Sequence, residues 1–186
     1  MKKKESKYIK VGAVSPKIRL GDVDYNVKAC IKEAKRAAEM GVKILAFPAL
    51  TLTGATCGDM FRQETLCKRA ELGLAEFVEA TAELDMMSFI GLPALVDGEV
   101  YKTTAVVYKG EIFALVPAND LDYREVAHFD PPGRETDGLT FAGRNTSLVI
   151  YPVFPTPFDK SIKVEICADY LDKNATVVIC PSADEE

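Results

Sequence analysis

The sequence predicts an α/β protein built on a mixed β-sheet. Short continuous apolar runs alternate with segments of helical periodicity, and two glycine-containing turn signals follow them. A chain of 186 residues with 48% apolar and 27% charged residues can bury one core, so we expect a single domain over 8–186. Residues 1–7 hold the basic cluster KKKESK, which we interpret as a solvated tail.

The first strand and helix form a repeating unit with the strand that follows them. Segment 8–16 is apolar and β-branched, which predicts a strand. From Asp24 onward, apolar and small residues recur at helical spacing as far as Gly41, a typical helix stop. The run VKILAFP at 42–48 is too short for a helix and is typical of a parallel strand covered on both faces. This order predicts a βαβ unit.

A second cycle follows, and then the strand direction reverses. Apolar residues from Leu66 to Thr81 recur at helical spacing, and the run at 86–93 predicts another buried strand. Asp97-Gly98 and Lys109-Gly110 are hairpin signals, so the strands beside them join the sheet antiparallel. The sheet is therefore expected to be mixed.

The segment 117–146 is rich in Asp, Pro, Gly and Arg and has little periodicity. We predict a long surface loop there, and such loops in compact domains are often functional. Strands are expected to resume in three later segments, 147–153, 161–166 and 175–181.

Composition excludes several classes of function. The net charge is −5 and no broad basic face is present, so no nucleic-acid partner is expected. No apolar stretch approaches the ~20 residues that span a bilayer, and no signal peptide is recognisable, which predicts a cytoplasmic protein without a membrane partner. Five scattered cysteines and one histidine favour neither a disulfide framework nor a metal site. No Gly-rich phosphate loop occurs either, and no cofactor is expected.

One cysteine has a position with chemical meaning. Cys167 in VEICADYL follows a predicted strand and precedes a short helical turn. Backbone N–H groups at a helix start favour negative charge, so a thiol there loses its proton more readily and becomes a nucleophile. The same local pattern also suits a small buried hydrophobic residue, and from this pattern alone both interpretations stay open.

Longer motifs resemble a known family. The segments GVKILAFPALTLTGATCGDMFRQETL, IGLPALVDGEVYKTTAVVYKGEI, VEICADYL and NATVVICPSA, in this order, resemble the nitrilase superfamily of carbon–nitrogen hydrolases. Within it they are most similar to the N-terminal glutaminase domain of glutamine-dependent NAD synthetase. The resemblance covers nearly the whole chain.

The resemblance implies a fold and a chemistry. The fold is an α-β-β-α sandwich, here truncated at its carboxyl end, because the family continues with a further helix and more strands. Sheet edge and helix face would then be uncovered, so a homo-oligomer is expected. The family hydrolyses amides with a cysteine nucleophile, a glutamate general base and a lysine that stabilises the oxyanion, and a small amide such as glutamine is the implied substrate. From its length, we expect this chain to hold no counterpart of the synthetase domain.

Residue by residue, the resemblance retains the nucleophile and loses its partners. It puts Cys167 at the nucleophile, Ala49 at the general base and Ala118 at the lysine. Ala55 stands where the family has a tyrosine, and Ala168 where it has a glutamate. The match between Ala118 and Phe129 is loose, and there Glu125 is carried over to the family's additional pocket glutamate. These substitutions predict an impaired or inactive hydrolase.

Several alternatives remain open at this stage. The chain could be a non-catalytic nitrilase-fold module that self-associates or binds a partner, or an unrelated α/β binding protein that shares the strand order. His128 in the long loop could pair with Cys167 or be an ordinary surface histidine. A carboxylate of Asp120, Asp122 or Glu125 could act as a base but could not supply the missing positive charge.

Overall fold

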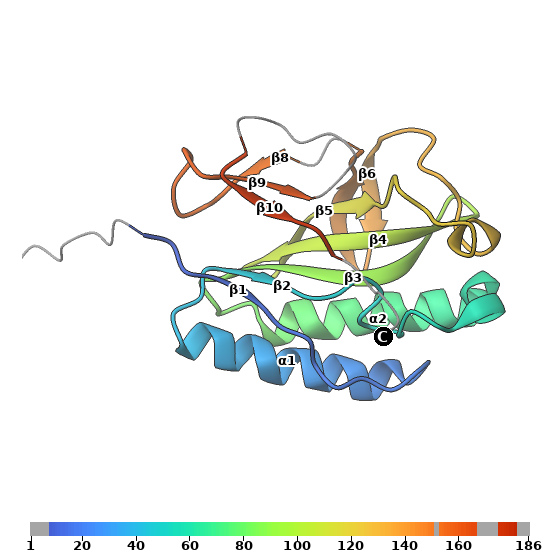
Figure 1. The fold of residues 1–186 in the computed structure, drawn as a ribbon, viewed down its shortest axis with the longest axis horizontal. Coiled ribbons are helices and arrows are strands. Elements are labelled where there is room, and N and C mark those ends of the chain that lie inside the picture. The colour runs from blue at the N-terminus through green and yellow to red at the C-terminus, as the bar shows by residue number, and fades with distance from the viewer. Residues whose placement is uncertain (1–7, 151–152, 167–174, 182–186) are drawn as a thin grey trace, which may run out of the picture.

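In the part of the chain that the structure describes, two β-sheets and two long helices are arranged in layers (Figure 1). The structure is a computed structural model, and it describes residues 8–150, 153–166 and 175–181. Its larger sheet has seven strands in the order β1-β2-β3-β4-β5-β7-β6. Their bounds are β1 Val11–Ala13, β2 Ile44–Ala46, β3 Met87–Val96, β4 Glu99–Tyr108, β5 Glu111–Pro117, β6 Thr136–Phe141 and β7 Arg144–Leu148.

Two 17-residue helices, α1 (Val23–Glu39) and α2 (Glu64–Ala80), cover one face of this sheet (Figure 1). Helix α1 begins where the Asp22 carboxylate accepts a hydrogen bond from the Tyr25 N–H at 3.1 Å, an N-cap contact. It ends before Gly41, whose φ of 78° lies in the left-handed region. Both helices and the parallel pairing of β1, β2 and β3 confirm the two predicted cycles.

The predicted hairpins are confirmed by backbone geometry. Asp97 and Gly98 have φ values of 52° and 89°, and Lys109 and Gly110 have values of 47° and 81°. Two consecutive positive φ values define the type I′ turn that joins twisted antiparallel strands. Strand β4 accordingly pairs antiparallel with β3 and with β5, so the sheet is mixed, as predicted.

The predicted loop over 117–146 is wrong in its second half. Residues after 135 form the hairpin of β6 and β7, which turns at Ala142 and Gly143 with φ values of 52° and 71°. Strand β6 has a largely exposed surface and includes Gly138, so its sequence TDGLTF lacks the apolar alternation of a half-buried strand. Between Pro117 and this hairpin lies a 3₁₀ turn, η2 (Glu125–Ala127).

A second sheet of three strands packs on the other face of the larger sheet (Figure 1). Its strands are β8 (Val153–Pro155), β9 (Lys163–Ile166) and β10 (Val177–Ile179), and β9 pairs parallel with β10 and antiparallel with β8. An apolar cluster joins the two sheets: Phe89, Val106, Ala114, Val116, Val164 and Ile166. Helices, large sheet and small sheet thus form successive layers. None of the helices in the described ranges combines the length and apolar character needed to span a bilayer.

Candidate active site

The turn after β2 carries Ala49 across the face of β3. Beyond β2 the pairing continues, because the Phe47 N–H donates to the Phe89 carbonyl at 2.9 Å. The next residues pass so close to Gly91 that a Cβ built there would lie 2.4 Å from the Leu50 nitrogen and 2.7 Å from the Ala49 Cα. Strand alternation puts Gly91 on the same face as Phe89, the face covered by the small sheet. Ala49 therefore lies over this inter-sheet face, and it is buried.

The same turn is held by strained and buried groups. Leu50 has φ 52°, a conformation that costs a non-glycine residue roughly 1 kcal/mol or more and persists only where its surroundings enforce it. The fully buried Asn26 side chain of α1 donates to the Leu52 carbonyl at 3.1 Å and to the Arg19 carbonyl at 2.8 Å. The helix thereby fixes the position of the turn.

Ala55 lies further along this turn and is half-buried. Its methyl group packs against the core on the helix side of the sheet, whereas Ala49 crosses the opposite face at Gly91. The turn continues into the 3₁₀ segment η1 (Gly58–Arg62).

Ala118 follows β5 and lies directly opposite Lys102 of β4. The Ala118 N–H donates to the Lys102 carbonyl at 2.8 Å, which continues the register in which Thr103 pairs with Pro117. Directly opposite residues of an antiparallel pair project to the same face, with Cβ atoms ~5 Å apart. Ala118 follows Val116 of the inter-sheet cluster by two residues, so its side chain projects to the inter-sheet face. The side chain of Lys102, directly opposite, projects to the same face.

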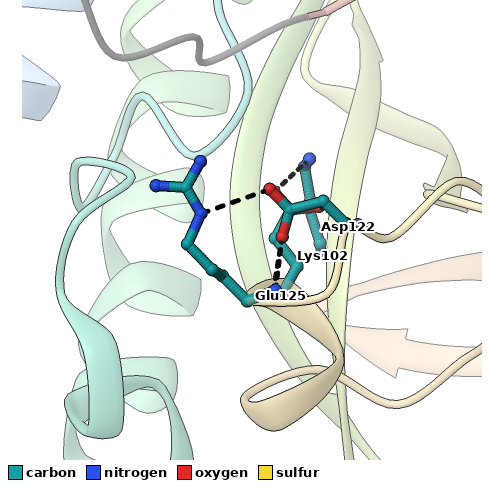
Figure 2. Close-up of polar contacts among 4 residues, drawn as sticks. Lys102, Asp122 and Glu125 are labelled. Atoms are coloured by element: carbon teal, nitrogen blue, oxygen red, sulfur yellow. Dashed lines mark hydrogen bonds and ion pairs between the residues drawn. The ribbon is translucent and has the colours of Figure 1, made fainter.

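Lys102 forms an ion pair with Glu125 beside this position (Figure 2). The Lys102 Nζ lies 2.6 Å from the Glu125 Oε1, and the two side chains are only 14% and 24% exposed. The other carboxylate oxygen, Oε2, accepts a hydrogen bond from the Asp122 N–H at 3.2 Å. Glu125 is thus held between the strand and its own loop.

Asp122 organises the start of the 3₁₀ turn that carries Glu125 (Figure 2). Its Oδ1 accepts hydrogen bonds from the backbone N–H groups of Arg124 and Glu125 at 2.7 and 2.8 Å. The pKa of the Asp122 carboxyl lies below its usual range, and the hydrogen bond from the Glu125 N–H is the largest cause. The hydrogen bond from the Arg124 N–H and the positive charges of Arg124 and Lys102 lower this pKa further. This carboxylate therefore stays ionised and acts as a local cap. Asp120 is exposed nearby.

The loop that carries Glu125 is fastened to β4 at both ends. Ala118 bonds to Lys102 at the start, and the Asp130 N–H donates to the Val100 carbonyl at 2.7 Å at the end. The Asp130 Oδ2 also accepts from the Val100 N–H at 2.8 Å and from the Arg62 guanidinium at 2.9 Å. This part of the predicted surface loop is therefore ordered by specific contacts.

His128 belongs to a different neighbourhood. Its imidazole lies against Phe61, with ring centroids 6.3 Å apart, and its Nδ1 is 3.7 Å from an Asp59 carboxylate oxygen. Both contacts are with η1. Within the described residues, the structure brings His128 to this helical turn and not to Lys102 or Ala118.

The nucleophile position itself, Cys167, lies outside the described residues, as does Ala168. Residues 1–7, the expected tail, also lie outside them. The last described residue of β9, Ile166, is 4% exposed and belongs to the cluster that contains Phe89 and Val116. Strand β9, which leads to Cys167, therefore shares one hydrophobic core with β2 and β5, which lead to Ala49 and Ala118.

An open cleft of about 540 Å³ lies elsewhere, between the edge strands of the two sheets. It is lined by β1, by β2 and its extension to Pro48, and by β10 with Cys180 and Pro181. Its walls are mostly apolar and include Val11 and Val178, which are 53% and 41% exposed. Ala118, Lys102 and Glu125 do not border this cleft.

Comparisons with known proteins agree with this architecture. The family model described as carbon-nitrogen hydrolase matches residues 10–181. A glutamine-dependent NAD(+) synthetase from Mycobacterium leprae is 28% identical over 119 residues, which are 63% of this chain and 18% of that protein. One from Arabidopsis thaliana is 32% identical over 108 residues, 56% of this chain and 14% of that protein. The chain thus spans less than a fifth of the length of these curated relatives.

Solved structures share the fold. A glutamine-dependent NAD(+) synthetase from Cytophaga hutchinsonii superposes with a TM-score of 0.83 at 23% identity, covering 95% of this chain and 30% of that one. An amidase from Nesterenkonia sp. superposes with a TM-score of 0.65 at 18% identity, covering 85% of this chain and 54% of that one. The layers described above are therefore those of a nitrilase-like fold.

Proposed function

Because the chain belongs to the carbon–nitrogen hydrolase family, we propose that it is a domain of the glutamine-amidase kind whose hydrolytic step is impaired. The curated relatives are glutamine-dependent enzymes, which supports a small amide such as glutamine as the ligand. In the proposed reaction the Cys167 sulfur adds to the amide carbonyl carbon. The tetrahedral intermediate then expels ammonia, and water hydrolyses the resulting thioester to a carboxylic acid.

The missing proton acceptor is the main reason to expect slow chemistry. A general base has to take the thiol proton and return it to the leaving nitrogen, and the Ala49 methyl group can do neither. The observation that carries the proposal is that Ala49 is buried, at 6% exposure, in a turn held against Gly91. Loss of a general base costs typically ~10²–10⁴ in rate.

The second missing group is the cation at position 118. A methyl group there provides no stabilisation for an oxyanion, and loss of such a donor costs typically ~10²–10³ in rate. The two losses do not multiply, since groups of one catalytic site act as a unit. The proposed domain is therefore a weak enzyme or a pseudoenzyme, with a thiolate at Cys167 still able to react with strong electrophiles.

Ammonia release from L-glutamine tests this proposal. We expect the double variant Ala49→Glu/Ala118→Lys to exceed the unmodified chain by about 100-fold or more, from the smaller of the two losses. Adding Cys167→Ser to that double variant should abolish the gain. A fast reaction in the unmodified chain, or equal rates with and without Cys167→Ser, would contradict the proposed role of this thiol.

A second candidate function is self-association as a non-catalytic module. The open cleft supports it, because edge strands β1 and β10 both border it and expose Val11 and Val178 there. Exposed apolar edges are surfaces that proteins normally cover. Sedimentation equilibrium of the chain and of Val11→Lys/Val178→Lys distinguishes the cases: we expect an oligomer that the double variant dissociates, and a monomeric unmodified chain would exclude this candidate.

A further inference from the structure

A lysine, Lys102, lies between the two alanines of the candidate site, Ala49 and Ala118. Lys102 is directly opposite Ala118 on one side. On its other side, β4 pairs with β3 so that Thr104 is opposite Gly91, which makes Lys102 a diagonal neighbour of Gly91 on the same face. Diagonal neighbours lie ~7–8 Å apart, within reach of a long side chain. The Ala49 main chain rests on Gly91.

The ammonium group of Lys102 is largely shielded from water and has hydrogen-bond donors available for a ligand. Its side chain is 14% exposed, and within the described residues its Nζ donates to the Glu125 Oε1. An ammonium group has three N–H donors, so two remain for another acceptor. Its cross-strand neighbour Ala118 has only a methyl side chain and is half-buried.

Glu125 makes this arrangement specific. Its carboxylate is itself fixed by the Asp122 N–H, so the lysine is paired with an anchored partner rather than with a mobile surface carboxylate. An ammonium group that is shielded from water has few water molecules to accept its hydrogen bonds. A ligand oxygen therefore stabilises it more than the same oxygen would stabilise a fully solvated lysine.

We propose that Lys102 supplies the positive charge of this site and donates to a carbonyl or carboxylate oxygen of the amide ligand. The inference rests on the proposed function for the class of ligand. It adds Lys102 to the site. This lysine lies on β4, next to the strand β5 that leads to position 118, and Glu125 holds its ammonium group in place.

Isothermal titration of the full chain with L-glutamine tests this role. Lys102→Met keeps the aliphatic stem and removes the charge, and we expect it to weaken binding about tenfold or more, as loss of a charged hydrogen bond does. Lys109→Met is the matched control, because Lys109 is an exposed lysine in the turn that follows the other end of β4, and its binding should equal that of the unmodified chain. Circular dichroism and urea midpoints establish that each variant is folded.

A charge-relocation variant makes the test sharper. Lys102→Met/Ala118→Lys moves the ammonium to the directly opposite position, and we expect it to recover most of the lost affinity. Lys102→Gln provides the same comparison if the methionine variant does not fold. Unchanged affinity in Lys102→Met or Lys102→Gln would overturn the role of Lys102. Absence of binding by the unmodified chain would instead overturn the proposed ligand, and with it this inference.

Discussion

The Cα of Ala49 would lie 2.7 Å from a Cβ atom built on Gly91, so glycine is required where the β2 turn crosses β3. Two other main-chain atoms, the Pro48 oxygen and the Leu50 nitrogen, would lie even closer, at 2.6 and 2.4 Å. Main-chain atoms cannot move aside as the tip of a flexible side chain can. Gly91 therefore determines how deeply position 49 enters the space between the sheets.

Gly91→Ala should lower the free energy of unfolding by about 1–3 kcal/mol, because the added methyl group overpacks the turn. Urea unfolding measures this change. Gly133→Ala is the matched control, since a Cβ there meets nothing within 4 Å and the backbone φ is not positive. We expect the control to stay within about 0.5 kcal/mol of the unmodified chain. Equal stability of the two variants would contradict the close approach described here.

Ala49→Glu alone should destabilise the fold. Position 49 is 6% exposed, so a carboxylate there loses water, and the neighbouring Lys102 is already paired with Glu125. We expect the free energy of unfolding at pH 7 to fall by about 1–3 kcal/mol, the cost of an unsatisfied buried polar group.

Adding Ala118→Lys should restore part of this stability, and a double-mutant cycle measures the coupling. Residues that share one site couple by about 0.5–3 kcal/mol. Strict additivity of the two substitutions would show that positions 49 and 118 do not share a site.

Acid should remove the contribution that the Asp85 carboxylate, near the starts of β2 and β3, makes to the stability of the fold. Hydrogen bonds from Lys43 and then Tyr108 lower the pKa of the Asp85 carboxyl. A group with a depressed folded-state pKa stabilises the fold above its unfolded pKa, ~3.9 for Asp, and this contribution is lost as the pH falls further. Since Asp85 is 52% exposed, we expect less than about 1 kcal/mol.

Comparison with Asp85→Asn isolates this contribution. The stability difference between the unmodified chain and this variant should be constant from pH 5 to 7, and it should shrink towards pH 2.5. A difference that persists unchanged at pH 2.5 would mean that the Asp85 charge contributes nothing.

Cysteine reactivity should follow burial. Desolvation raises the pKa of Cys30 to about 12 and that of Cys67 to about 11, so both thiols stay protonated at pH 8. Cys180 is exposed. Iodoacetamide labelling of the native protein, mapped by mass spectrometry, should modify Cys180 but leave Cys30 and Cys67 unmodified until guanidinium unfolds the chain. Early labelling of Cys30 would contradict its place in the core.

The sequence was sufficient to predict the two helices, the parallel strands and the hairpins at Asp97-Gly98 and Lys109-Gly110. Their signals are local: helical spacing that ends at Gly41, continuous apolar runs, and the dipeptides Asp97-Gly98 and Lys109-Gly110. Strand β6 was missed because its sequence TDGLTF is polar and mostly exposed, so no burial pattern distinguishes it from a loop. Its pairing with β7 decides its structure instead.

The role of Lys102 could not be predicted because it depends on an irregular register. Near the turn, Tyr108 pairs with Glu111 and Val107 with Ile112, but Val106 then pairs with Ala114. A regular ladder counted from the turn would put Lys102 opposite Pro117. The bulge between Val106 and Val107 shifts it to Ala118. Asn26 was missed for a related reason, since its contact with Leu52 spans 26 residues of sequence.

A crystal structure that locates the Cys167 sulfur tests the account most directly. We expect this atom to face a cavity shared with Ala49 and Ala118, within about 10 Å of both Cβ atoms, or roughly two strand spacings. A sulfur atom far from either alanine, or enclosed by hydrocarbon without access to a cavity, would contradict the proposed active site.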